Sequence, residues 1–396
     1  MFADRTGWSL ASNAISRRLQ ALRERGIQVL DLTESNPTKV GIRYPEGLLA
    51  PLSDPRSLLY EPSAQGLRSA REAVASLCAS SGVRPNPDQV LLTASTSEAY
   101  SHLFRLLADP GDSVLVPAPS YPLFQYLADL NDVEPIRYPL RYEGGWRIGL
   151  EALERSVRKG TKAVVLIHPN NPTGSCVTSQ ELDRIVRICR RERLALISDE
   201  VFAPYLYKAA GAEGGEIPPS LAGDPEVLAF TLGGISKSLG LPQMKLAWIL
   251  VTGPADLVQP ALGRLELILD TYLSVATPVQ GALSRWLEFA PAIQSQIRRR
   301  LIRNRRLLTD RLTGGEAVCL EADGGWNGVL RVPGIQDEEE WVLRLLEEER
   351  LLLHPGYFFD FEEPGHLVIS LLPPPEVFEE GVTRLLRRVR ASPRPS

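Results

Sequence analysis

The hydrophobic positions of this chain fall into short, nearly continuous runs rather than into an alternating pattern. A strand that is buried on both faces has no polar side, so such runs are typical of a mainly parallel sheet covered by helices. The pattern predicts strands at "QVLLTA" (89–94), "SVLVP" (113–117), "EPIRYPL" (134–140), "KAVVLIHP" (162–169), "LALISDE" (194–200), "VLAFTLGG" (227–234) and "LAWILVTG" (246–253).

Between several of these runs, apolar residues recur at helical spacing instead. Residues 96–108 and 179–193 predict helices, and the second has Thr178 or Ser179 as a candidate N-cap and Glu181 in its first turn. Strands that alternate with helices predict an α/β fold with a doubly wound, mainly parallel sheet.

The pattern changes after about residue 290, where a long basic helical stretch precedes short strands and a Glu-rich helix. We therefore predict a large domain over residues 48–290 and a smaller α+β domain over residues 291–396. Residues 1–47 are expected to form an N-terminal arm that contributes to the small domain.

Composition and charge narrow the classes of function. The chain has 396 residues, of which 44% are hydrophobic, so it can bury a large core. Its formal net charge of −4 gives no electrostatic reason to expect nucleic acid or an anionic membrane as partner. Two basic stretches, 296–308 and 383–396, carry leucine or isoleucine at helical spacing, which favours amphipathic helices with a solvated basic face over nucleic-acid binding.

Cysteine and histidine positions argue against a metal site. The four cysteines lie far apart without a CxxC pair, and the four histidines form no cluster. We expect neither a zinc site nor disulfides, which is typical of a reducing cytoplasm. No apolar stretch approaches the length of a membrane span, so we expect a soluble, cytoplasmic protein.

Candidate chemistry gathers where several predicted strands end. Lys237 follows one strand after a Gly-Gly pair, Asp199 ends another, and Asn171 lies in an Asn-Pro-Thr-Gly turn after a third. Taken singly, each has an ordinary explanation as a surface lysine, a helix cap or a turn residue. Together they favour a site, because the carboxyl ends of parallel strands meet at one edge of the sheet.

In these motifs and their order, the sequence resembles the class I/II aminotransferases, enzymes that use pyridoxal 5′-phosphate (PLP). The resemblance covers nearly the whole chain. It is carried by "LTESNPT", "YEPSAQGLRSAREAVA", "DPGDSVLVPAPSYPLF", "HPNNPTG", "SDEVF", "GISKSLGLPQMKLAW" and "HPGYFF". It implies the fold of aspartate aminotransferase and the transfer of an amino group between an amino acid, or a related amine, and a keto acid.

The resemblance also implies roles for the residues at the strand ends. Lys237 would form the Schiff base with PLP and then move the proton of the 1,3-shift as general base and acid. Asp199 would keep the pyridine nitrogen protonated, which makes the ring an electron sink. Asn171 would donate a hydrogen bond to the ring 3′-oxygen, and Tyr121 would stack on the ring. In this interpretation the Gly-Gly pair before Ser236 leaves room for the cofactor.

The cofactor phosphate has its own set of implied contacts. Thr96 and Ser97 lie at a predicted helix N-terminus, which is a ready anion site, and Ser236 and Lys245 would complete the phosphate cup. Tyr60 matches the family tyrosine that reaches the phosphate of the neighbouring subunit. The resemblance therefore implies a homodimer with shared active sites.

Three positions depart from the family pattern. Phe202 replaces a tyrosine that hydrogen-bonds the ring 3′-oxygen, and Lys245 replaces an arginine, so the phosphate would meet a point charge instead of a fork. Val368, in "HLVISLL", stands where the family has the arginine that grips the substrate carboxylate. Either another cation, with Arg331 and Arg43 as first guesses, supplies that grip, or the substrate is an amine or a modified amino acid; we favour the second.

Two other functions use the same residues. A PLP-dependent lyase that carries out C–S β-elimination needs the same lysine and cofactor. A non-catalytic binding or regulatory module on this fold is disfavoured, because Lys237, Asp199 and Asn171 are all retained and no DNA-binding segment is seen at the N-terminus. The sequence does not name the amino donor or the acceptor.

Overall fold

A computed structural model of the 396-residue chain provides the structure, which describes residues 1–79, 82–207, 218, 220–222, 226–334 and 337–391. Within these residues the largest element is a sheet of eight strands. Its members are β2 Val90–Thr93, β3 Ser113–Ala118, β4 Glu134–Tyr142, β5 Trp146–Ile148, β6 Thr161–Ile167, β7 Ala195–Asp199, β8 Ala229–Gly234 and β9 Ala247–Thr252. Each of the seven apolar runs forms one of these strands, as predicted.

The strand order is β2-β9-β8-β7-β6-β3-β4-β5. β4, β3, β6, β7 and β8 pair in parallel, whereas β9 is antiparallel to both β8 and β2, and β5 is antiparallel to β4. The carboxyl ends of β2, β6, β7 and β8 therefore lie at one edge of the sheet, together with the start of β9. This is the edge at which ligands bind in open α/β sheets.

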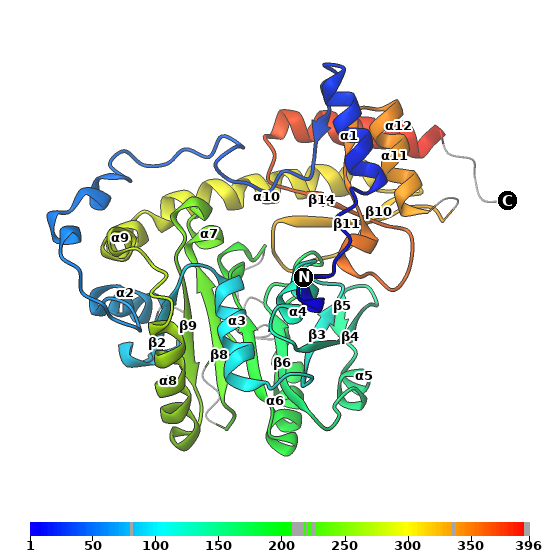
Figure 1. Cartoon of the computed structure of the whole chain (residues 1–396). Coiled ribbons are helices and arrows are strands. Elements are labelled where there is room, and N and C mark those ends of the chain that lie inside the picture. The colour runs from blue at the N-terminus through cyan, green and yellow to red at the C-terminus, as the bar shows by residue number, and fades with distance from the viewer. Residues whose placement is uncertain (80–81, 208–217, 219, 223–225, 335–336, 392–396) are drawn as a thin grey trace.

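Side chains of the central strands are buried on both faces, which explains their continuous apolar pattern. In β6, Ala163 and Val165 pack in one core with the helices α3 Thr96–Leu107 and α8 Ala255–Asp270. Val164 and Leu166 pack in another core with α6 Ser179–Glu192. Helices α3 and α8 lie in front of the sheet in Figure 1. The fold is thus the predicted doubly wound α/β arrangement.

The helices match the predicted positions closely. Thr178 is the N-cap of α6, because its hydroxyl accepts from the Glu181 amide and Glu181 in turn accepts from the Thr178 amide, which is a capping box. The helices are α1 Ala14–Glu24, α2 Arg68–Ala79, α3 Thr96–Leu107, α4 Phe124–Asp129, α5 Leu150–Arg155, α6 Ser179–Glu192, α7 Ile235–Ser238, α8 Ala255–Asp270, α9 Thr277–Glu288, α10 Ala290–Leu312, α11 Glu338–Glu348 and α12 Pro375–Ala391.

A second group of elements forms its own core next to the large sheet. β10 Val318–Cys319, β11 Asn327–Arg331, β14 His366–Ser370 and β13 His354–Pro355 form an antiparallel sheet in that order. β1 Leu30–Asp31 pairs in parallel with β12 Leu351–Leu352, so the N-terminal arm joins this group. We keep the boundaries at residues 47/48 and 290/291 as a proposal. The core of this group supports it, and Phe202 and Tyr205 of the large segment also pack into that core.

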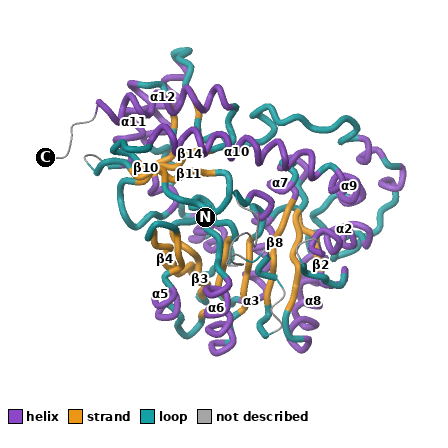
Figure 2. The backbone as a smooth tube through the Cα atoms, turned by 180° about the vertical axis from the view of Figure 1, so that it is seen from behind, coloured by secondary structure: helices purple, strands orange, loops and turns teal. Residues whose placement is uncertain are grey.

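Helix α10 connects the two groups, running above the large sheet toward α11 and α12 in Figures 1 and 2. Its basic stretch forms an amphipathic helix as predicted, since Ile293, Ile297, Leu301 and Leu308 are buried. The other basic stretch lies in α12 up to Ala391, and residues 392–396 are outside the described part.

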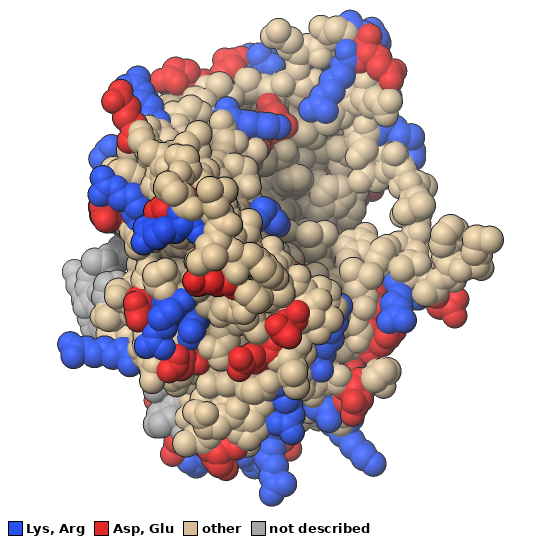
Figure 3. Space-filling model, turned by 60° about the vertical axis from the view of Figure 1, so that its left-hand side comes forward, with Lys and Arg blue, Asp and Glu red and all other residues tan. Residues whose placement is uncertain are grey.

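The surface charge, the hydropathy of the helices and the arrangement of possible metal ligands bear on which partners the protein can have. Figure 3 shows acidic and basic side chains intermixed over one face, with a recess whose walls are mostly uncharged. Among the described residues, no helix has the length and hydropathy that crossing a bilayer requires. Nor do the described histidine, cysteine and acidic residues come together in threes as candidate metal ligands.

Candidate active site

One cavity of about 200 Å³ lies at the edge where β2, β6, β7 and β8 end and β9 begins. It brings together most of the residues that the motifs single out, although they are far apart in sequence. Its described lining consists of Ser95, Thr96, Ser97, Tyr100, Tyr121, Phe124, Leu127, Ile167, Asn171, Asp199, Val201, Phe202, Gly234, Ser236, Lys237 and Ala247. Of the predicted site residues, only Lys245 and Tyr60 lie outside this lining.

Lys237 is held in α7, directly after β8. Its Nζ lies 4.9 Å from the ring centroid of Trp326 and 5.6 Å from that of Phe202, so it faces two aromatic rings. The backbone carbonyl of Lys237 accepts a 2.7 Å hydrogen bond from the Tyr205 hydroxyl, which fixes this turn. Burial lowers the pKa of Lys237 and the charge of Asp199 partly offsets this, so more of the amine is neutral than for an ordinary lysine.

The Gly-Gly pair before this lysine has a different cause from the one we predicted. A Cβ at Gly233 would lie 2.5 Å from the indole of Trp248 on the neighbouring strand, and a Cβ at Gly234 would lie 3.1 Å from the Ala247 Cβ. The interpretation that both glycines make room for a cofactor is therefore corrected for Gly233, where packing against Trp248 requires the missing side chain. Gly234 does line the cavity.

Asp199 is the last residue of β7 and is buried. Its Oδ1 accepts from the Val201 amide at 3.2 Å, and its Oδ2 accepts from the Tyr100 hydroxyl, also at 3.2 Å. Burial raises the pKa of Asp199 to about 6, against the two hydrogen bonds and the Lys237 charge, which lower it. The sequence motifs gave no indication of Tyr100.

Asn171 follows β6 in the Asn-Pro-Thr-Gly turn, which the second group of elements holds in place. Gly174 accepts backbone hydrogen bonds from Asp323 and Gly324, both at 2.9 Å, and its φ of 68° together with a 2.2 Å approach of a Cβ to the Gly324 oxygen requires glycine there. From Gly324 the chain continues to Asn327, the first residue of β11. Asn327 Nδ2 donates to Asn171 Oδ1 at 2.7 Å. No motif singled out Asn327 either.

The N-terminus of α3 points its first amides at the cavity. Ser95 is the N-cap, and its hydroxyl accepts from the Glu98 amide, so Thr96 and Ser97 form the first turn of a twelve-residue helix. The first amides of a helix have no acceptor within it, which makes this end suited to an anion. Ser236 lines the same cavity, whereas Lys245 is exposed in a left-handed conformation.

The remaining predicted residues differ in exposure. The Tyr121 side chain is 39% exposed and lines the cavity, and Phe202 is buried beside Lys237. Tyr60 is 70% exposed and lines a different hollow, which it shares with Leu273 and Gln280. Within the described chain, then, Tyr60 does not belong to the cavity around Lys237.

Val368, which the resemblance aligns with the family's arginine, lies in the small sheet. It is fully buried in β14, where it pairs with Val329 and His354. Arg331 is exposed and ends β11, whereas Asn327 begins it, so the two residues are about 13 Å apart along the strand. Arg43 is exposed as well, and its backbone bonds to the side chain of Gln296. Neither arginine lines the cavity.

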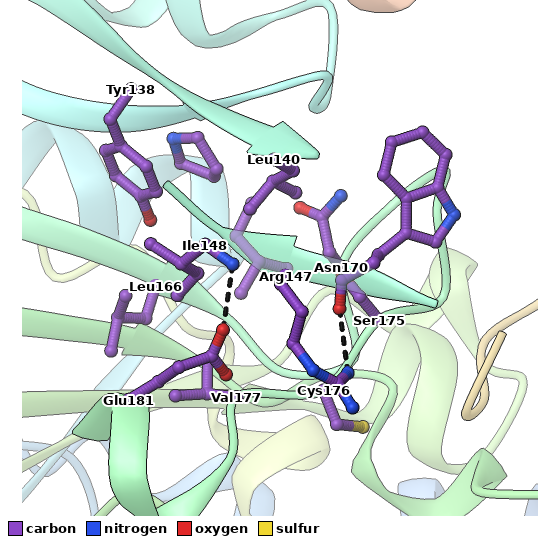
Figure 4. A pocket seen from close by; sticks show the side chains of 13 residues that line it. Tyr138, Leu140, Arg147, Ile148, Leu166, Asn170, Ser175, Cys176, Val177 and Glu181 are labelled. Atoms are coloured by element: carbon purple, nitrogen blue, oxygen red, sulfur yellow. Dashed lines mark hydrogen bonds between the residues drawn. The ribbon is translucent and has the colours of Figure 1, made fainter. Parts of the chain in front are cut away.

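A second cavity lies behind the Asn-Pro-Thr-Gly turn, between β4, β5 and β6 (Figure 4). There the Glu181 carboxylate accepts from the backbone amide of Ile148 at 2.8 Å. The backbone amide of Asn170 donates to the backbone carbonyl of Ser175, also at 2.8 Å. With a volume of about 10 Å³ the cavity has room for about one water molecule. It is therefore too small for a substrate.

Comparison with known proteins agrees with this geometry. The profile of "Aminotransferase class I and II" matches residues 28–385. The glutamate-pyruvate aminotransferase AlaA of Haemophilus influenzae is 30% identical over 380 residues, 92% of each chain. The alanine aminotransferase of Mycobacterium tuberculosis is 30% identical over 89% of this chain and 83% of its own. An alanine aminotransferase structure from Pyrococcus furiosus has a TM-score of 0.89 at 24% identity, covering 99% of this chain and 100% of its own. The protein therefore belongs to the class I and II aminotransferase family and is an aminotransferase, as its motifs predicted.

Proposed function

We propose that this aminotransferase uses PLP, bound covalently by Lys237, to move an amino group between an amino acid or related amine and a keto acid. The observation that carries the proposal is the single cavity that holds Lys237, Asp199, Asn171 and the N-terminus of α3. PLP requires an amine, an acid for its ring nitrogen, a donor for its ring oxygen and an anion site for its phosphate. The residues in the cavity supply all four.

Each residue has a definite task in this proposal. Bound PLP supplies an electron sink for the charge that develops at the substrate α-carbon. Asp199 would hold a proton at the ring nitrogen, and Asn171 would donate to the ring oxygen. Lys237 would then act as the general base that takes the proton from the substrate α-carbon and as the general acid that completes the 1,3-proton shift. Its lowered pKa suits the first role, because a neutral amine can accept a proton.

Phosphate binding is assigned to the first turn of α3 and to Ser236. The amides and hydroxyls of Thr96 and Ser97 would donate to the phosphate oxygens at the positive end of the helix. We keep Lys245 as a proposed counter-charge, although its side chain is exposed. Tyr121, which lines the cavity, would cover the ring face.

We propose a homodimer in which Tyr60 reaches the phosphate of the partner's site. The two residues that directly precede Tyr60 are apolar and exposed: Leu58 is 91% exposed and Leu59 is 62% exposed. Exposed apolar side chains in one region mark an interface that association would bury. The expected location remains the cytoplasm, which the four free cysteines support. The partners are small molecules, and we propose no contact with nucleic acid or membrane.

We propose that the substrate has no free carboxylate at the position that the family's arginine grips, or that neutral groups bind its carboxylate. Lys237 is the only cationic residue in the described lining of the cavity, and it is committed to the cofactor. On the face of the small sheet that carries Val368, the diagonal neighbours are Asn327 and Arg331. Ser370 lies opposite Asn327, and Arg331 is exposed and does not line the cavity. A carboxylate without a charged partner costs free energy to bury, so ordinary α-amino acids should bind weakly.

A screen of amino donors tests the function. The relatives' names suggest L-alanine and L-glutamate with pyruvate as first substrates, to be compared with the corresponding amines and amino acid amides. The proposal expects one equivalent of keto product, or of aldehyde from an amine, as bound PLP is converted to its amine form. Release of ammonia with the cofactor unchanged would instead identify a lyase. A protein that binds no PLP would overturn the proposal.

A further inference from the structure

We propose that Tyr100 is a positioning residue that orients Asp199 and keeps its carboxylate available to the cofactor ring nitrogen. This inference rests on the proposed use of PLP. It assigns a role to a residue of the cavity wall that none of the recognised motifs includes.

The hydrogen bonds of Asp199 are distributed evenly between its two oxygens. Oδ1 accepts from the Val201 amide and Oδ2 from the Tyr100 hydroxyl, each at 3.2 Å. A carboxylate oxygen has two lone-pair directions, so one direction on each oxygen remains for a ligand. Because the two bonds come from opposite elements, the backbone after β7 and helix α3, they fix the plane of the carboxylate.

Tyr100 is itself held rigidly. Its side chain is buried, and its ring lies 5.0 Å from that of Phe124 in an edge-on arrangement and 6.0 Å from that of Phe104. Thr96 precedes it by four residues in α3, so both residues lie on one face of the helix. Helix α3 thus presents its phosphate-binding end and the partner of Asp199 to the same cavity. It sets the spacing between the two ends of the cofactor.

The direction of the hydrogen bond is also fixed. Burial and the nearby Asp199 raise the pKa of Tyr100 well above its ordinary value, so the phenol remains protonated and donates. Other groups that face Asp199 are Lys237, whose charge lowers the pKa of the carboxyl, and Tyr121, whose own pKa is raised by burial and by Asp199. Removing the Tyr100 hydroxyl would take away one of the contacts that lower the pKa of Asp199, so burial would raise this pKa further.

A buried tyrosine can also serve packing alone, and the test has to separate the two roles. Tyr100→Phe removes the hydroxyl and keeps the ring against Phe104 and Phe124, so the variant is expected to fold. Tyr138→Phe is a matched control, because the Tyr138 hydroxyl is buried too but donates to the Val165 carbonyl, at 2.7 Å. Circular dichroism melting curves verify that both variants are folded.

Equilibrium dialysis then measures the dissociation constants of PLP and of its analogue with carbon in place of the ring nitrogen. We expect Tyr100→Phe to weaken PLP binding about tenfold, the size of a hydrogen bond to a charged group. Binding of the analogue, which cannot pair with Asp199, should weaken twofold or less, and Tyr138→Phe should leave the ratio of the two constants unchanged. Equal weakening of both ligands by Tyr100→Phe, or no weakening of PLP, would overturn the proposal. If the native protein binds no PLP, the proposed function itself fails.

Discussion

The hydrogen bond between Asn327 and Asn171 gives a sharp prediction, because one substitution reverses its polarity without changing its size. Asn327 donates Nδ2 to Asn171 Oδ1 at 2.7 Å, across the junction of the two sheets. With its oxygen engaged, the Asn171 amide can turn only its NH₂ group toward the cofactor oxygen. Asn327→Asp replaces the donor by an acceptor and favours the opposite orientation of the Asn171 amide.

The expected loss follows from the population of the correct orientation. In Asn327→Ala, neither orientation is favoured, so about half of the molecules remain competent and PLP affinity falls about twofold. In Asn327→Asp, a charge-assisted hydrogen bond of about 1.5–3 kcal/mol stabilises the reversed amide. The competent fraction then drops to roughly 1–10%, and the dissociation constant rises about 10- to 100-fold.

Equilibrium dialysis with PLP measures these constants directly. Asn86→Asp is the control for added charge, since Asn86 is an exposed N-cap residue and aspartate caps helices equally well. The predicted order of affinity is native, then Asn327→Ala, then Asn327→Asp, with Asn86→Asp equal to native. If Asn327→Asp binds PLP as tightly as Asn327→Ala, the orientation argument is refuted.

Three further predictions concern the departures from the family and the dimer. Phe202 gives no hydrogen bond to the ring oxygen, so the anionic form of that oxygen is less stable than it would be beside a tyrosine. The absorption band of the bound cofactor should therefore titrate at higher pH in the native protein than in Phe202→Tyr. An equal or lower midpoint in the native protein contradicts this. Mixing Lys237→Ala with Tyr60→Phe subunits, each impaired alone, should restore activity at one site of the hybrid dimer; no recovery despite demonstrated subunit exchange argues against shared sites. Val368 is fully buried in β14, so a melting curve must first show that Val368→Arg folds. In a folded variant the KM of ordinary α-amino acids should fall about tenfold, because the carboxylate gains one charge-assisted contact, and the KM of amines should not change. Efficient turnover of an amino acid by the native protein, abolished by removing Arg331 or Arg43, would show that the clamp has moved.

The sequence was sufficient for the strands of the large sheet because their burial on both faces leaves a continuous apolar pattern. It did not show β5, whose three residues, "WRI", alternate with a charge. It also did not show that β9 runs antiparallel, since a continuous apolar run reads the same in either direction. Strand position was therefore predictable, and strand direction was not.

The same limit applies to the cavity. Lys237, Asp199 and Asn171 could be predicted because they occur in ordered motifs at strand ends. Tyr100 lies among the apolar positions of an amphipathic helix, and in the sequence it has the pattern of a core residue. Asn327 contacts Asn171 from a strand 156 positions further along the chain, and no local pattern encodes that contact. Gly233 was assigned to the cofactor because its neighbour Trp248 is adjacent only across the sheet.

Chemical trapping identifies the lysine that carries the cofactor, which we propose to be Lys237. The native protein, loaded with PLP and reduced with borohydride, is digested, and the modified peptides are identified by mass spectrometry. We expect one modified peptide, with the cofactor on Lys237, and loss of that label in Lys237→Ala. A label on Lys245 or on any other lysine in the native protein would contradict it.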